Sequence, residues 1–524
     1  MKKHSKTITS VLVFLFLLVF LKVDYRYINE LNCCGDDFDY YSHAYTMSVD
    51  FNFDYSDLLD KNSNATYQYK DKIAPFGFFG SGLLAAPFVF IGNLIDYFDT
   101  ASVVSNKVFV YSLSAIFYLF VSILLLYESL RILNLKVNIF FISLVFMGSG
   151  LAYFSFERYS MTHVYEVFTI VLIFYLIVKI NTIKSTNIYI FLLPISIVLA
   201  LSVRFTNYYV ILLPFIYQEL FFREKVASYY KSKYFISSLL GSFSIFIYIN
   251  YLIYGQITFN PVNLYYGDAY RVTDYFSEVS TFSSFFLYNF KVFATVLFSQ
   301  EFGIFWFNPV IVVGLFLFLR MMLKSRNNYL LLFSIFFAYA FNFALVAVWS
   351  STASSYGFRY LLSLVPLSLI IFYSVEDSSM KKILKSYITF FSFFGLLSIL
   401  FFESTKFTEL STEVIINSFG NEDLYTNPTY LSGVIKSFIN VGAYMKIVAT
   451  SFLFACILKF LLLFTSNITL LNFLEKFIND KDYLEKFGTY LQTIDDSGIH
   501  QFLITLLLIG YFSLQLIRKS EIKN

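Results

Sequence analysis

Charge and cysteine are scarce in this chain, and each shortage excludes a class of protein. Only 14% of the 524 residues are charged, whereas soluble domains carry about 25%, so an ordinary soluble protein is excluded. Three cysteines are too few for a disulfide framework. A formal net charge of +3 gives no electrostatic basis for binding nucleic acid. The ten-residue alternating segments of a membrane barrel are also missing from the sequence.

Long apolar runs fill the chain instead. Hydrophobic residues make up 58% of it, and runs of about 20 residues, the length of a membrane-spanning helix, recur from one end to the other. Backbone amides in lipid must be satisfied within their own segment, so the runs predict an all-α polytopic membrane protein with about 11 to 13 spans. The predicted spans lie at about residues 6–23, 103–127, 137–154, 164–178, 188–222 (a hairpin), 234–251, 303–320, 329–348, 360–373, 387–402, 441–464 and 502–516.

The basic N-terminus sets the predicted orientation. Lys2, Lys3 and Lys6 precede the first apolar run and place the N-terminus in the cytoplasm by the positive-inside rule. No small-residue cleavage site follows that run, so we expect an uncleaved first span. Residues 24–102 then form a large first outer loop. Within it, residues 75–95 contain four glycines and two prolines and are expected to form an interfacial or re-entrant helix.

Seven ionisable residues at the edges of predicted spans fall on the outer side in this topology. They are Asp36, Asp37, Lys72, Arg158, His163, Arg204 and Arg359. Ionisable groups near the membrane interior are costly and are usually functional, so their convergence predicts a shared polar cavity at the outer leaflet. Alternatives exist for single members, because Arg204 and Arg359 can extend to lipid headgroups and His163 can hydrogen-bond a neighbouring helix.

Carboxylates opposite cations at a lipid surface suit transfer chemistry on a lipid phosphate. A carboxylate can take the proton of an attacking hydroxyl, and arginine or lysine can stabilise charge on a phosphate leaving group. A polyprenyl-phosphate sugar donor fits both, because its tail lies in the bilayer and its phosphate lies at headgroup level. Asp36 and Asp37 are also candidate ligands of a divalent metal, the one cofactor considered, and their adjacency does not decide between these roles.

The acidic motif and several later motifs resemble the polytopic GT-C class of glycosyltransferases, in particular the bacterial relatives of protein mannosyltransferases and of the lipid A aminoarabinose transferase. Asp36-Asp37-Phe38-Asp39-Tyr40 is similar to the Asp-Glu-x-x-Tyr that opens the outer loop of that class, with Asp37 in place of Glu. Motifs at 50–54, 75–77, 86–88, 162–165, 204–207, 303–309 and 355–360 keep the family's order. The resemblance covers residues 1 to about 370.

The resemblance implies a GT-C-like catalytic transmembrane domain over residues 1–374, with juxtamembrane helices in its first outer loop, and a C-terminal transmembrane region of unknown role at 375–524. It implies an inverting transfer, with or without a metal, from a polyprenyl-phosphate sugar to a lipid, glycan or protein acceptor at the outer face of a bacterial inner or plasma membrane. In this scheme Asp36 is the catalytic carboxylate and Asp37 its partner. The implied phosphate contacts are Lys72, Arg204 and Arg359, and the implied substrate-positioning residues are Tyr40, His163 and Arg158.

Two other functions compete with this interpretation. A transporter or flippase of a polyprenyl-linked or anionic lipid usually places charged sites near the bilayer midplane and is often built from inverted repeats, neither of which the sequence shows. A polysaccharide polymerase or ligase also acts on polyprenyl-linked glycans at the outer face. Such enzymes depend on a large late loop, whereas the acids here gather in the first loop. A transfer assay with defined donors and acceptors separates the three functions.

Overall fold

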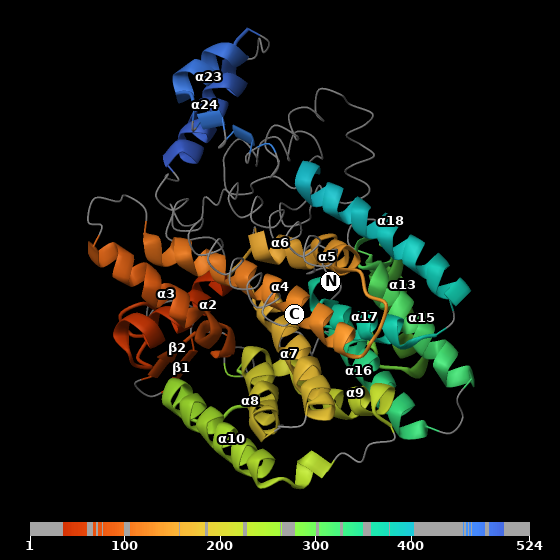
Figure 1. Ribbon diagram of the computed structural model, residues 1–524. Helices are drawn as coiled ribbons and strands as arrows, with labels where there is room; N and C mark the ends of the chain where they lie inside the picture. Colours follow the sequence, from red (N-terminus) through yellow and green to blue (C-terminus); the bar gives the residue numbers. More distant parts are fainter. Residues whose placement is uncertain are drawn as a thin grey trace, which may run out of the picture.

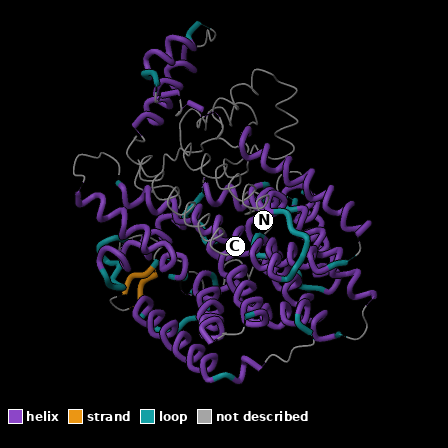
Figure 2. The backbone as a smooth tube through the Cα atoms, in the orientation of Figure 1, coloured by secondary structure: helices purple, strands orange, loops and turns teal. Residues whose placement is uncertain are grey.

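In the part of the chain that the structure describes, helices predominate and a short hairpin lies close to α2 (Gly35–Tyr45) and α3 (Gly80–Phe98) (Figures 1 and 2). The structure is a computed structural model that describes residues 35–59, 67–69, 72–75, 77–98, 105–156, 158–183, 187–223, 228–261, 264, 278–299, 303–324, 328–348, 358–376, 378–402, 454, 457–458, 461–462, 464–476 and 481–496. The fold is that of an all-α membrane protein, as the composition predicts.

The helices follow one another with mostly short connections. The α-helices are α2 (Gly35–Tyr45), α3 (Gly80–Phe98), α4 (Asn106–Ile132), α5 (Ile139–Met147), α6 (Gly150–Phe156), α7 (His163–Thr182), α8 (Asn187–Val203), α9 (Leu213–Phe221), α10 (Lys233–Tyr254), α13 (Phe282–Phe298), α14 (Ile304–Phe307), α15 (Pro309–Lys324), α16 (Tyr329–Val348), α17 (Leu364–Ser374), α18 (Ser378–Phe402), α23 (Asn467–Leu474) and α24 (Lys481–Asp496). Short π- or 3-10-helical turns are η1 (Thr46–Asp50), η2 (Phe205–Leu212), η3 (Ser228–Lys231) and η5 (Arg359–Leu361).

The predicted first outer loop contains helices, as expected, and also a β-hairpin that the sequence did not indicate. Strand β1 (Tyr67–Tyr69) pairs antiparallel with β2 (Lys72–Ala74), with Tyr67 opposite Ala74. In Figure 1 the hairpin lies beside α2 and α3, and β2 also contacts α10. The polar segment after the first predicted span is therefore folded against the helices, at least in its described part.

Glycines in α3 allow this helix to pack closely on two neighbours at once. A Cβ on Gly82 would collide with the side chain of His43 in α2. A Cβ on Gly80 would collide with Ser202 near the end of α8. The glycines on which the prediction of an interfacial or re-entrant segment at 75–95 is based thus allow α3 to pack closely against α2 and α8. The resulting helix is also long and apolar enough to span a membrane, so the interfacial position stays a prediction.

Helices α4 and α7 form the centre of the molecule. In their most apolar windows, 72% of the residues of α4 and 78% of those of α7 are buried, whereas the corresponding share of α10 is 22%. A helix that is apolar on all sides is either central or in contact with lipid. The exposed apolar faces of α10 and α18 are therefore the surfaces that suit lipid, and α4 and α7 supply the packed core.

The predicted count of 11 to 13 spans is not reached in the described part of the chain. Six helices there are long and apolar enough to cross a membrane, or seven if α5 and α6 form one span bent by 72°. The segment 188–222, expected to be a hairpin, is broken after α8 at the extended residue Arg204 and continues as η2 and α9. The predicted span at 303–320 is interrupted at Asn308 between α14 and α15. The predicted spans at 6–23 and 502–516 lie outside the described residues.

Candidate functional site

Asp37 forms an ion pair that ties α2 to the loop before α7. Its side chain is fully buried, and its Oδ2 lies 3.3 Å from Nη2 of Arg158. The hydroxyl of Ser160 donates a hydrogen bond to Oδ1. Asp36, its neighbour in the predicted acidic pair, belongs to α2, but its side chain lies outside the described part of the structure.

A second buried group joins the start of α7 to the end of α8. Nη1 of Arg204, the residue after α8, lies 3.4 Å from Oε2 of Glu166 and 3.3 Å from Nδ1 of His163. The carboxylate of Glu166 is 3.8 Å from the same histidine nitrogen. Glu166 and His163 are three residues apart on one helix, so their side chains share a face. Both are only 2–3% exposed.

Tyr360 connects the second group to a third, at the turn before α17. The guanidinium carbon of Arg204 lies 5.1 Å from the centre of the Tyr360 ring, and that of Arg359 lies 4.9 Å from it. Nη2 of Arg359 also donates a hydrogen bond of 2.9 Å to the Tyr360 hydroxyl. Cations within about 6 Å of an aromatic ring are attracted to its face. The ring therefore brings two arginines together.

These groups form one cluster. Arg204 contacts His163 directly, Tyr360 links Arg204 to Arg359, and the charges of Arg359 and Arg158 also act electrostatically on the histidine ring. We call the set the arginine cluster: Asp37, Arg158, His163, Glu166, Arg204, Arg359 and Tyr360. Its members come from α2, the loop before α7, α7 itself, the end of α8 and the turn before α17.

The far end of α2 is fixed by a buried histidine. Nε2 of His43 donates a hydrogen bond of 2.8 Å to the carbonyl of Gly77, and Nδ1 accepts one of 2.8 Å from the hydroxyl of Tyr55. The Tyr254 hydroxyl at the end of α10 donates to the same carbonyl, at 2.7 Å. Burial lowers the pKa of His43 to about 4, so the ring is neutral in this arrangement. The helix that carries the acidic pair is thus held at both ends.

Four of the predicted residues meet in the arginine cluster together with Asp37, and two others lie elsewhere. His163 and Arg204 are in contact, Arg359 shares the Tyr360 ring with Arg204, and Arg158 pairs with Asp37. Lys72 lies in β2, beside Gly255 at the end of α10, and its described contacts do not include the cluster. Tyr40 packs its ring against Gly77.

The sequence interpretation missed Glu166 and Tyr360. Glu166 was detectable, because an acid one helical turn after His163 in an apolar run is a costly residue that usually has a function. Tyr360 carried no such signal, since tyrosine is one of the commonest residues of this chain. Within the described residues, no three histidine, cysteine or acidic side chains gather as a metal site.

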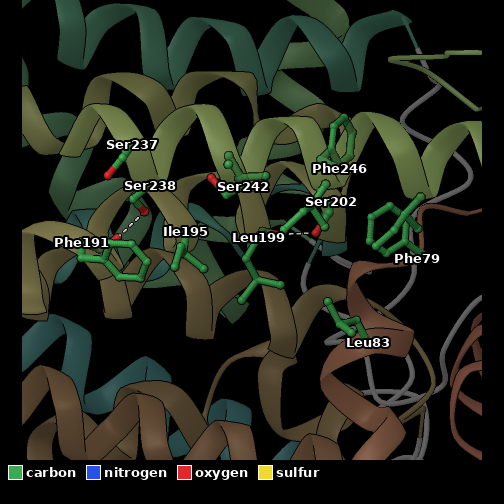
Figure 3. Close-up of a pocket in the computed structure, with 14 residues that line it drawn as sticks. Phe79, Leu83, Phe191, Ile195, Leu199, Ser202, Ser237, Ser238, Ser242 and Phe246 are labelled. Atoms are coloured by element: carbon green, nitrogen blue, oxygen red, sulfur yellow. Dashed lines mark hydrogen bonds between the residues drawn. The ribbon is translucent and has the colours of Figure 1, made fainter. Parts of the chain in front are cut away.

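An apolar groove of about 290 Å³ lies between α8 and α10, next to the N-terminal end of α3 (Figure 3). Its wall along α8 includes Phe191, Ile195 and Leu199, and it ends at Ser202, two residues before Arg204. Serines in the groove satisfy their hydroxyls on backbone carbonyls, as Ser238 does on Phe191. The groove therefore presents an apolar lining suited to an aliphatic chain.

The arginine cluster contains three arginines and the buried carboxylates of Asp37 and Glu166. One of the arginines, Arg204, follows the groove residue Ser202 by two positions in the chain. Arginine is well suited to binding phosphate, because its planar guanidinium donates two parallel hydrogen bonds. Comparisons of the chain with protein-family models, curated proteins and solved structures find no match.

Proposed function

We propose that the protein is a membrane glycosyltransferase of the GT-C type, which transfers a sugar from a polyprenyl-phosphate donor to an acceptor hydroxyl at the outer face of a bacterial cell membrane. The observation that carries the proposal is the pair of arginines, Arg204 and Arg359, on the ring of Tyr360, together with Arg158 paired to Asp37 on the helix that also bears Asp36. Cations for a phosphate and carboxylates for a proton are the two requirements of this reaction.

In the proposed reaction, the carboxylate of Asp36 takes the proton of the acceptor hydroxyl as the acceptor oxygen bonds to the anomeric carbon of the sugar. The bond from that carbon to the phosphate oxygen breaks, and the polyprenyl phosphate leaves with the electron pair. Attack from the face opposite the leaving group inverts the anomeric centre. Arg204 and Arg359 stabilise the charge that grows on the phosphate.

Asp37 supports this chemistry from its ion pair. Because its two oxygens are engaged by Arg158 and Ser160, Asp37 fixes the N-terminal turn of α2, where Asp36 also lies. The same ion pair holds Arg158 against α2. This division of roles makes Asp36 the base and Asp37 its structural partner.

The groove between α8 and α10 supports a lipid substrate. The lining of the groove is apolar. Its last lining residue on α8 is Ser202, and Arg204 follows two residues later in the chain. A polyprenyl chain in the groove would leave its phosphate at the end of α8.

The test is a transfer assay with the full-length protein in lipid nanodiscs and a panel of radiolabelled polyprenyl-phosphate sugars. We expect one donor to be consumed with release of polyprenyl phosphate, and Asp36→Asn to abolish the release while the protein stays folded. The matched control is Asp57→Asn, which changes an exposed acid on the segment after η1. Movement of labelled lipid across the bilayer without cleavage would instead establish a flippase and overturn the proposal.

A further inference from the structure

We infer that Glu166 is a positioning residue for the donor phosphate: it holds the guanidinium group of Arg204 in its place between His163 and Tyr360. This inference rests on the proposed function. It assigns a role to a carboxylate that lies outside the acidic pair of α2 and that no motif at the start of the chain indicates.

The geometry places Glu166 behind Arg204. Oε2 of Glu166 is 3.4 Å from Nη1 of Arg204, and the ring of Tyr360 is 5.1 Å from the Arg204 guanidinium carbon. Glu166 is 2% exposed. A carboxylate so deeply enclosed is poorly placed to meet a substrate itself, and it acts through the cation that it contacts.

Electrostatic repulsion explains why Arg204 needs this partner. Arg204 and Arg359 share one aromatic ring, with guanidinium carbons 5.1 and 4.9 Å from its centre, and Arg158 also acts on the adjacent histidine. Like charges in a site of low dielectric repel strongly. The charge of Glu166 offsets that of Arg204, so the guanidinium can remain beside Arg359 before any phosphate arrives.

Stability alone is a weak reason for this ion pair. Replacing a buried ion pair by apolar residues of similar volume is often neutral or stabilising. A fixed guanidinium, by contrast, binds phosphate with less loss of side-chain entropy, because its donors already point in the required directions.

The experiment is a double-mutant cycle on Glu166→Gln and Arg204→Lys, read out as kcat and as KM for donor and acceptor separately. We expect Glu166→Gln to raise the donor KM about tenfold or more and to leave the acceptor KM unchanged. Adding Glu166→Gln to Arg204→Lys should cost little more, because lysine has no guanidinium group for Glu166 to orient. Glu166→Asp should recover part of the donor affinity.

The matched control is Glu128→Gln, which removes the acid of another ion pair three residues apart on a helix, with Arg131. This variant should keep wild-type kinetics. The inference would be overturned if the double mutant raised the donor KM by the product of the two single-mutant factors. An unchanged donor KM in Glu166→Gln would also overturn it. If Glu166→Gln does not purify as a folded protein, the Glu166→Asp and Arg204→Lys cycle gives the same test.

Failure of the proposed function has a different signature. If the wild-type protein transfers no sugar from any donor, the glycosyltransferase proposal fails. The same variants are then compared by equilibrium binding of polyprenyl phosphate in nanodiscs. Weakened binding in Glu166→Gln, with no further loss on adding Arg204→Lys, supports the positioning role without turnover, and equal binding in all variants refutes it.

Discussion

Arg204 lies over the ring of Tyr360, with 5.1 Å between its guanidinium carbon and the ring centre. The ring also contacts Arg359. It therefore fixes the distance between Arg204 and Arg359, the two arginines proposed to bind the donor phosphate. Removing the ring should therefore loosen both cations, whereas removing the hydroxyl alone should not.

We predict that Tyr360→Leu weakens donor binding about fivefold, because a cation–π contact contributes roughly 0.5 to 2 kcal/mol. Tyr360→Phe keeps the ring and should bind nearly as the wild type does. Donor KM in the transfer assay and affinity for polyprenyl phosphate are the measurements. Equal losses in the two variants would mean that the hydroxyl, and not the ring, organises the arginines.

We predict that Asp37→Asn destabilises the fold by roughly 3 kcal/mol, because truncating one partner of a buried ion pair leaves the other poorly solvated. Arg158 and Ser160 would lose their link to α2. The free energy of unfolding from chemical denaturation followed by circular dichroism measures this. Glu128→Gln, in a more exposed pair, should cost less than about 1 kcal/mol. Similar costs for both would show that the Asp37 pair is not a fixed link.

We predict that Gly82→Ala destabilises the protein by about 1 to 3 kcal/mol, because the added Cβ would push α3 away from His43 in α2. Gly241→Ala in α10 is the matched control: its Cβ would meet no atom within 4 Å, and alanine is the better helix former. The control should be neutral or slightly stabilising. Thermal unfolding of both variants in one detergent gives the comparison, and a neutral Gly82→Ala would contradict the tight packing.

We predict a pH dependence of stability that depends on His43. Its pKa falls from 6.5 in the unfolded chain to about 4 when it is buried, so the unfolded state binds a proton first as the pH drops. The contribution of this residue is complete above pH 6.5 and is lost as the pH falls toward 4, by roughly 3 kcal/mol in total. His43→Gln does not titrate, so the difference in unfolding free energy between wild type and variant should shrink over that interval. A constant difference would show that His43 is not held neutral.

We predict that filling the groove discriminates between donors by chain length. Leu199→Trp places a large side chain in the groove and should raise the KM for a long polyprenyl donor several-fold, while a short-chain donor is affected much less. Leu240→Trp on the exposed face of α10 is the control and should affect neither. If the tryptophan at 199 changes both donors equally, the tail lies elsewhere.

The sequence predicted some helices closely and others badly, and packing explains the difference. Uninterrupted apolar runs at 103–127, 234–251 and 329–348 became α4, α10 and α16 with small changes of boundary. The run at 137–154 contains Gly148, and there the helix bends by 72° between α5 and α6. Hydropathy reports apolarity along the chain, whereas such a bend depends on a neighbouring helix that hydropathy does not include.

The candidate site was predictable where charge was costly. Arg158, His163, Arg204 and Arg359 stood out because ionisable groups at the ends of apolar runs are rare, and the structure gathers them. Ser160 was not predictable, because its role depends on how the loop before α7 meets α2. Lys72 had the same signal as the arginines, but the hairpin carries it toward the end of α10. The sequence therefore identifies candidate charged residues, but the three-dimensional fold determines which of them lie at the site.

The bend at Gly148 has a consequence for any shortened version of the protein. Gly148 and Gly395 of α18 touch through backbone atoms, with no side chain between them. A chain cut at residue 374, where the sequence places a domain boundary, would lose the surface on which this bend rests. Helix α6 connects this bend to Arg158. Expression of the first 374 residues alone would therefore disturb the helix that positions Arg158. An inactive fragment would not show where catalysis occurs.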